Sequence, residues 1–270
     1  MSILKNYNGF ILDLDGVIYL GNQLVPHSKK CVERINRLGI KYVFVTNDCR
    51  LSALQYSQKL RNFGIPCTKE QIITPLSVLL RQLTNKSSRK TPGVLAFTSK
   101  KVRRGLKSNK NIKILDPEKD YKSAQIVLVA GSQDFNYMDL MYACLAIQNG
   151  ATFYTTSKDY TFPSNYGYLI PGTGAIVAAI EKATGANAIN LGKPSKAIFD
   201  IAVKFLDLKR SKVLMIGDNI QTDIYGSKLS RIDSALVLTG KNRIKDLKKV
   251  KFKPKFILKN LKEVFDSKNC

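Results

Sequence analysis

Residues 10–16 read FILDLDG, an apolar run that ends in two aspartates and a glycine. The run from Phe10 to Leu14 predicts a buried strand of a parallel sheet, whose carboxyl end lies at residues 13–16. Side chains alternate along extended backbone, so Asp13 and Asp15 point to the same side, and Gly16 lets the chain turn away. The stretch therefore predicts two carboxylates presented together where a buried strand ends.

The segments that follow alternate between helix and strand. Apolar spacing and stop signals predict helices over residues 28–38, 52–63, 137–148 and 175–183, and strands over 41–45, 94–97, 126–129, 152–155, 213–216 and 235–238. We also expect Thr173 to cap a helix, Pro194-Ser195 to start another, and residues 158–174 to form a loop. Such alternation is typical of an α/β fold, and its restart after Pro75 indicates a second α/β unit between two parts of the first.

Polar side chains stand just after several of these strands. Thr46 and Asn47 follow the second strand, and Asp218 follows a later one, with Asp223 five residues on. In open parallel sheets, ligands bind outside the carboxyl ends of the strands, so these groups should converge with the two aspartates. Lys193, just ahead of a helix, could reach the same place.

These residue types suit phosphoryl transfer. An ionised aspartate needs no base to attack phosphorus, because its reference pKa is about 3.9, and a second carboxyl group can protonate the leaving oxygen and later activate water. Clustered carboxylates repel one another unless a cation joins them, and Mg²⁺ suits oxygen ligands, with Asp13 and Asp218 as candidates. Thr46, Asn47 and Lys193 supply donors for the phosphoryl oxygens. D-x-D alone is a weak signal, so the prediction depends on the joint occurrence.

The bulk composition excludes several classes of protein. With 270 residues, 44% hydrophobic and 24% charged, the chain is expected to be globular and to hold one or two domains. A single histidine and five cysteines without a CxxC pair argue against a Ser-His-Asp triad or a zinc site. No signal peptide or membrane span is visible, so the cytoplasm is the expected location and no membrane partner is expected.

The net charge of +24 raises nucleic acid as a partner. The lysines are spread along the chain and are not interleaved with aromatic residues as stacking platforms, which favours a solvated basic surface instead. A small phosphorylated metabolite is the expected partner, and nucleic acid the less favoured one.

Five stretches, in this order and spacing, resemble the haloacid dehalogenase superfamily of phosphatases. The match is to subfamily IIA, whose members include NagD-type nucleotide phosphatases, p-nitrophenylphosphatases, phosphoglycolate phosphatases and pyridoxal phosphate phosphatases. The stretches span nearly the whole chain: LDLDGVIYLGNQLVP (12–26), FVTNDCRLS (44–52), IPGTGAIVAAIEKATG (170–185), GKPSKAIFD (192–200) and GDNIQTDIYGS (217–227).

This resemblance implies a role for each group in the reaction. Asp13 would be the nucleophile and Asp15 the general acid and base. The residues expected to hold the phosphoryl group are Thr46, Asn47 and Lys193.

The resemblance also implies a magnesium site. Mg²⁺ would be bound by Asp13, by the backbone carbonyl of Asp15 and by Asp218. Asp223 would lie outside this set, where it orients a metal-bound water or contacts Lys193.

The architecture implied by the resemblance is a Rossmann-like three-layer α/β core with a parallel sheet and an inserted α/β cap domain. We place the core in residues 1–75 and 187–270 and the cap in residues 76–186. A cap loop near residues 159–168 would lean over the site and select the substrate, through Asp159, Tyr160, Asn165 and Tyr168. Relatives often pair through the cap, so a homodimer is an open expectation.

The chain departs from the family pattern at two places. Asp48 and Cys49 stand where members often have Asn-Ser, and an added acid there could weaken anion binding unless Arg50 or Lys193 offsets it. KLSRI at 228–232 replaces small residues and is interpreted as a packing variation. Two other functions stay open: phosphotransfer between positions of a sugar phosphate, which the large insertion disfavours, and nucleic-acid binding with a vestigial or end-processing site.

Overall fold

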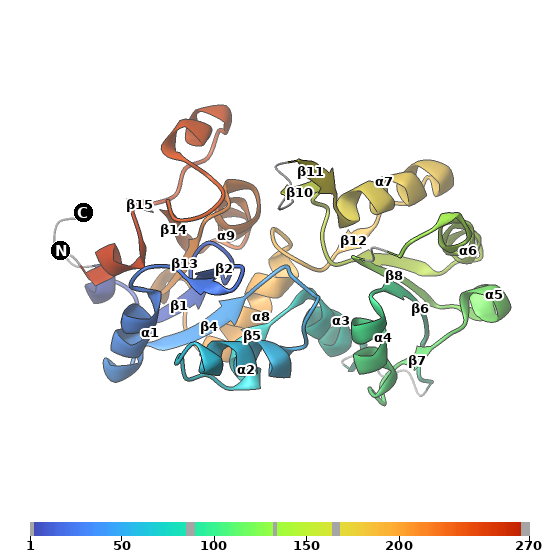
Figure 1. Ribbon diagram of the computed structural model, residues 1–270, viewed down its shortest axis with the longest axis horizontal. Helices are drawn as coiled ribbons and strands as arrows, with labels where there is room; N and C mark the ends of the chain where they lie inside the picture. Colours follow the sequence, from blue (N-terminus) through green and yellow to red (C-terminus); the bar gives the residue numbers. More distant parts are fainter. Residues whose placement is uncertain (1–2, 85–89, 132–133, 164–167, 266–270) are drawn as a thin grey trace. The chain divides into compact units, whose positions relative to one another are not determined.

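The computed structural model describes residues 3–84, 90–131, 134–163 and 168–265. The chain divides into two compact units (Figure 1). The first unit comprises residues 1–46, 53–74 and 193–270, and the second comprises residues 47–52 and 75–192. Each unit has its own sheet and its own flanking helices, as expected for an α/β core that carries an inserted α/β cap.

A six-stranded parallel sheet forms the centre of the first unit, in the order β15-β14-β13-β1-β4-β5. Its strands are β1 (Gly9–Leu12), β4 (Lys41–Val45), β5 (Ile72–Ile73), β13 (Val213–Gly217), β14 (Asp233–Val237) and β15 (Phe256–Leu258). Leu12 pairs with Phe44 on one side and with Ile216 on the other. All residues of β1 and β13 are buried, because layers of helices cover both faces of the sheet.

Amphipathic helices supply those outer layers. They are α1 (Ser28–Arg37), α2 (Ala53–Asn62), α8 (Lys196–Leu206) and the short α9 (Tyr225–Leu229). Helix α1 buries Cys31, Val32 and Ile35, which lie on one face at helical spacing. It ends where Gly39 adopts a left-handed φ of 67°, a conformation that favours glycine. A small hairpin, β2 (Tyr19–Leu20) and β3 (Gln23–Leu24), follows the first strand.

The second unit holds a five-stranded parallel sheet, in the order β12-β9-β8-β6-β7. Its strands are β6 (Gly93–Thr98), β7 (Lys113–Ile114), β8 (Ile126–Ala130), β9 (Thr152–Thr155) and β12 (Ile189–Asn190). Its helices are α3 (Pro75–Thr84), α4 (Lys100–Lys107), α5 (Pro117–Asp120), α6 (Tyr137–Gln148) and α7 (Thr173–Thr184). Strand residues Val127 and Phe153 pack with Val177 and Ile180 of α7 in its hydrophobic core.

Each predicted helix and strand is present, with ends within two residues of the prediction. Three details were wrong. Residues 158–174 are not a plain loop, because β10 (Thr161–Pro163) and β11 (Leu169–Pro171) pair as an antiparallel hairpin. Gly172, not Thr173, is the N-cap of α7, since Gly172 is extended and Thr173 is already helical. Helix α8 begins at Lys196, after Pro194, with Ser195 as its N-cap.

Within the described residues, none of the helices has the length and the apolar character that a membrane crossing requires.

Candidate active site

Asp13 lies where the order of the strands in the core sheet reverses, next to β1. The chain passes from β1 to β4 on one side, and it later returns to β13 on the other side of β1. Such a switch point leaves a crevice at the carboxyl ends of the strands. The Asp13 amide donates to the Ile216 carbonyl at 3.0 Å, and the Asp13 carboxylate accepts from the Leu14 amide at 2.8 Å. The backbone thus holds this carboxylate at the switch point.

Lys193 is a buried cation beside Asp13. Its ammonium lies 2.7 Å from a carboxylate oxygen of Asp13 and 2.7 Å from one of Asp223. It also lies 3.3 Å from the Val45 carbonyl, to which it donates. Burial alone would lower the pKa of Lys193, but the charges of the two carboxylates outweigh burial and raise that pKa, so the ammonium stays protonated.

Asp218 and Asp223 come from the segment that follows β13. A turn of π-helix, η5 (Ile220–Ile224), carries Asp223 and directs it toward Lys193. The Asn219 amide donates to Asp223 at 3.0 Å, and the Lys241 amide donates to Asp218 at 2.6 Å. Single turns of π-helix are frequent at functional sites.

Glycines let the backbone come close to these carboxylates. A Cβ atom on Gly16 or on Gly240 would collide with the carboxylate of Asp218, and one on Gly217 would collide with Asp223. Gly16 also adopts a φ of 76°, a conformation that side chains disfavour. The sequence predicts Gly16 as a turn residue, but Gly240 is not assigned to the site from the sequence. The local signal for Gly240 is its place shortly after the end of β14.

The carboxylates of Asp13, Asp218 and Asp223 form a donor set for a cation. One oxygen of each lies within 4.8 Å of the others, and all three residues are buried. Burial, and next the repulsion of Asp223, raise the pKa of Asp13 well above its usual range and that of Asp218 to about 6. When all three acids are ionised beside the ammonium of Lys193, negative charge is in excess, and a cation would offset it. Hard oxygen donors of this kind fit Mg²⁺.

Asp15, Thr46 and Asn47 take the positions expected of residues that follow strands. Asp15, two residues after Asp13, is half-buried and forms an isolated β-bridge with Tyr19. Thr46 is buried directly after β4, and its amide donates to the Ile73 carbonyl at 3.1 Å. Asn47 is half-buried and belongs by its contacts to the second unit.

The added acid at position 48 is paired. The Arg50 guanidinium donates two hydrogen bonds in parallel to Asp48, from Nε to Oδ1 at 2.9 Å and from Nη2 to Oδ2 at 2.8 Å. Bidentate pairs of this kind are the strong form of a salt bridge. The Arg50 side chain is otherwise 80% exposed. Burial raises the pKa of the neighbouring Cys49 thiol to about 12, so this cysteine stays protonated and unreactive.

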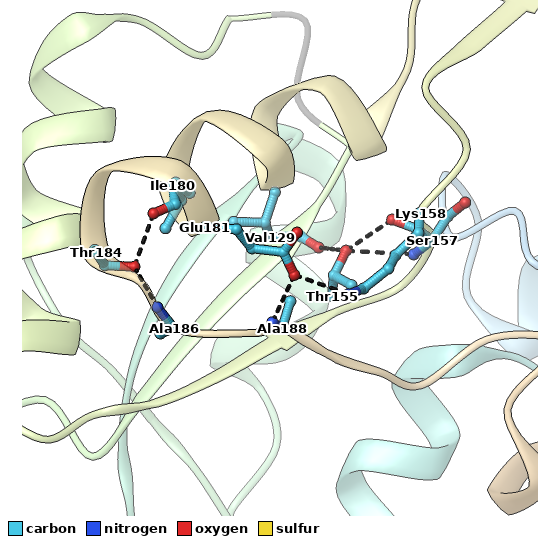
Figure 2. A network of polar contacts seen from close by, with 9 residues as sticks. All are labelled: Val129, Thr155, Ser157, Lys158, Ile180, Glu181, Thr184, Ala186 and Ala188. Carbon is cyan, nitrogen blue, oxygen red and sulfur yellow. Dashed lines mark hydrogen bonds and ion pairs between the residues drawn. The ribbon is translucent and has the colours of Figure 1, made fainter.

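The loop expected to select the substrate is anchored by a polar network in the second unit (Figure 2). The Thr155 hydroxyl lies within hydrogen-bond distance of the carbonyls of Val129 and Ser157, at 3.1 and 2.9 Å. Lys158 pairs with Glu181 at 2.8 Å, which ties the loop to α7.

Beyond that anchor, three of the four expected specificity residues are described. Asp159 accepts from the Ser157 hydroxyl at 2.9 Å, and it is therefore engaged in holding its own loop. Tyr160 and Tyr168 are exposed, at 65% and 75%. Asn165 lies outside the described residues.

The sequence and the fold match known hydrolases. Residues 10–110 match the haloacid dehalogenase-like hydrolase family, and residues 190–264 match a HAD-hydrolase-like family. The 5′-nucleotidase YutF of Bacillus subtilis is 30% identical over 88% of this chain and 89% of its own. The structure of a 4-nitrophenylphosphatase from Thermotoga maritima superimposes with a TM-score of 0.87 and 28% identity over 98% of each chain. A glycerol phosphate phosphatase from Mycobacterium tuberculosis, in complex with magnesium, matches with a TM-score of 0.87 and 26% identity over 98% of this chain and 78% of its own.

Proposed function

Because the chain belongs to the haloacid dehalogenase-like hydrolases of subfamily IIA and is a hydrolase of phosphoric monoesters, we propose that it works with Mg²⁺ through a phosphoaspartate formed on Asp13. The proposed substrates are small phosphate monoesters such as sugar phosphates and nucleotides. Phosphatase relatives that act on nucleotides, nitrophenyl phosphate and glycerol phosphate support this breadth.

One observation carries the proposal. Asp13 lies at the switch point of the core sheet, and the buried ammonium of Lys193 lies 2.7 Å from its carboxylate, with Asp218 and Asp223 in the same cluster. Burying charged groups this deeply is costly to the fold, and clusters of such groups concentrate where a ligand binds or a reaction takes place. A nucleophilic carboxylate beside a fixed cation is the arrangement that attack on an anionic phosphoryl group requires.

In the first half-reaction, a carboxylate oxygen of Asp13 attacks phosphorus, and the bond from phosphorus to the ester oxygen breaks. Asp15 gives its proton to the departing alkoxide, which leaves as the alcohol. The Lys193 ammonium, with the Thr46 hydroxyl and the Asn47 amide, holds the phosphoryl oxygens and offsets their charge.

In the second half-reaction, water attacks the phosphorus of phospho-Asp13. Asp15, now a carboxylate, takes the proton from that water, and phosphate leaves as the Asp13 carboxylate returns. Asp223 acts through Lys193, since their 2.7 Å ion pair fixes where the ammonium points. A bound Mg²⁺, held by Asp13, Asp218 and the Asp15 carbonyl, would supply charge stabilisation for the phosphoryl oxygens.

We further propose that the inserted cap unit selects the substrate through the anchored loop of Asp159 and the hairpin that follows it. The exposed rings of Tyr160 and Tyr168 are the apolar surface that this region offers to a leaving group. Replacing both tyrosines by Ser should change the order of preference among substrates without abolishing hydrolysis of p-nitrophenyl phosphate. An unchanged order would place the specificity elsewhere.

Asp13→Asn tests the nucleophile. The variant should lose at least about 10⁴-fold in kcat for p-nitrophenyl phosphate with Mg²⁺ and keep its circular dichroism spectrum. Glu118→Gln is the matched control, because it makes the same change at an exposed position of the cap. Near-normal turnover by Asp13→Asn would refute the covalent mechanism.

Asp15→Asn separates the two roles. A nitrophenolate leaves without a proton, whereas a sugar alkoxide needs one. The rate of phosphorylation of Asp13 should therefore fall far more with sugar phosphates than with p-nitrophenyl phosphate. Because Asp15 is also the base for hydrolysis, phosphoenzyme should accumulate and be trapped by acid quench. Equal losses in all steps, with no trapped phosphoenzyme, would contradict the role of Asp15.

A further inference from the structure

A turn at residues 240–243 touches the acidic cluster directly. The Lys241 amide donates to the Asp218 carboxylate at 2.6 Å, and the Asn242 amide donates to the Asp218 carbonyl at 3.2 Å. Gly240 packs so close to Asp218 that any Cβ there would collide with the carboxylate. The backbone of the turn thus forms one wall of the site.

The turn carries two cationic side chains, Lys241 and Arg243, and both are exposed. The Arg243 guanidinium lies over the turn, within hydrogen-bond distance of the carbonyls of Gly240 and Asn242, at 2.5 and 3.2 Å. Lys241 is exposed, and it holds Asp218 through its backbone, so the turn does not need its ammonium. Among the described residues, no carboxylate lies within ion-pair distance of the Lys241 or Arg243 side chains.

The positive charge continues along the chain beyond the turn. Residues 241–255 hold eight lysines and arginines against one acid, Asp246. The aromatic residue Phe252 does not offer a stacking surface, because its ring packs on Tyr225 at a centroid distance of 5.0 Å. The segment therefore lacks an open aromatic ring for base stacking, and its cationic side chains favour contacts with phosphate groups instead.

Resting on the proposed phosphatase function, we propose that the 240–243 turn is a second phosphate subsite, which makes bisphosphorylated small molecules the preferred substrates. A lysine side chain reaches about 6 Å from its Cα, so the Lys241 ammonium can lie within about 10 Å of Asp218. Three to five bonds of a sugar skeleton place two phosphorus atoms about 5–9 Å apart. While one phosphoryl group lies at Asp13, the other then reaches Lys241 and Arg243.

The first experiment compares substrates in the full-length protein with Mg²⁺. Fructose 1,6-bisphosphate should be hydrolysed with a kcat/KM at least about tenfold above those of fructose 1-phosphate and fructose 6-phosphate at low salt. The ratio should shrink at 0.3 M salt, where exposed charges are screened. A ratio near one at low salt, with p-nitrophenyl phosphate still hydrolysed, would overturn the subsite alone. No hydrolysis of p-nitrophenyl phosphate would instead overturn the proposed function on which the subsite rests.

Variants then locate the effect. Lys241→Ala and Arg243→Gln should each reduce the bisphosphate-to-monophosphate ratio about fivefold, and glutamine still donates to the turn carbonyls. Lys204→Ala, which removes the same charge from an exposed position on α8, should leave the ratio intact. Calorimetry on Asp13→Asn, which cannot turn over, should show tighter binding of fructose 1,6-bisphosphate than of fructose 6-phosphate. Equal affinities, or a ratio unaffected by either turn variant, would overturn the subsite.

Discussion

Asp218→Asn should make the protein more stable when no divalent cation is present. Asp218 is 7% exposed, and burial, with the repulsion of Asp223, raises its pKa to about 6, against a reference value of about 3.9. Two pKa units correspond to about 3 kcal/mol of cost to the folded state once the group is ionised. Asparagine removes the charge and keeps an oxygen that accepts from the Lys241 amide.

The sign follows from proton binding. Between about pH 4 and pH 6 the folded protein binds more protons at Asp218 than the unfolded chain does, so this residue's contribution to stability falls as pH rises. The variant should therefore exceed the wild type by about 3 kcal/mol at pH 7.5, and the difference should shrink toward pH 4. In a chain of this size that corresponds to a rise in Tm of roughly 6–12 °C.

Urea denaturation in EDTA at several pH values measures the difference directly. Asp233→Asn is the control of opposite sign: burial raises the pKa of Asp233, but the hydrogen bonds from Lys255 and Tyr7 outweigh it and lower that pKa. This variant should therefore lose stability at pH 7.5. Saturating Mg²⁺ should stabilise the wild type and not Asp218→Asn. A variant no more stable than the wild type in EDTA would refute the claim that Asp218 carries an uncompensated charge.

Three further outcomes are expected. Arg50→Ala should raise KM for p-nitrophenyl phosphate about fivefold, because it leaves the charge of Asp48 unpaired, and adding Asp48→Asn should restore KM. An unchanged KM in Arg50→Ala would show that Asp48 does not face the substrate. Gly240→Ala should weaken Mg²⁺-induced stabilisation and lower kcat/KM at least about tenfold, because the added methyl group displaces Asp218. Gly105→Ala, on the exposed face of α4, is the control: it should preserve kcat/KM and add about 0.5–1 kcal/mol of stability. The half-saturating Mg²⁺ concentration should rise about tenfold per pH unit below pH 6, since a proton on Asp218 must leave before the cation binds; a requirement independent of pH would contradict this.

Local patterns were sufficient for most helices and strands. The prediction for residues 137–148 matches α6, and that for 152–155 matches β9, because apolar spacing within such segments reflects the face that each one buries. The β10–β11 hairpin was not predicted. Its strands pair Thr161 with Pro171 across a stretch rich in proline and glycine, and local sequence signals there favour a loop.

The sequence by itself determined which groups follow which strands: Asp13 after β1, Thr46 after β4 and Asp218 after β13. Parallel strands end at one edge of a sheet, so their order along the chain was enough to predict a shared site. Only the tertiary structure decided how those charges are balanced. The pairing of Lys193 with Asp13 spans most of the first two thirds of the chain, and the contact of Gly240 with Asp218 depends on packing. The pKa of each carboxyl group and the fit of a cation depend on burial and on the distances between charges. A short stretch of sequence determines neither burial nor these distances.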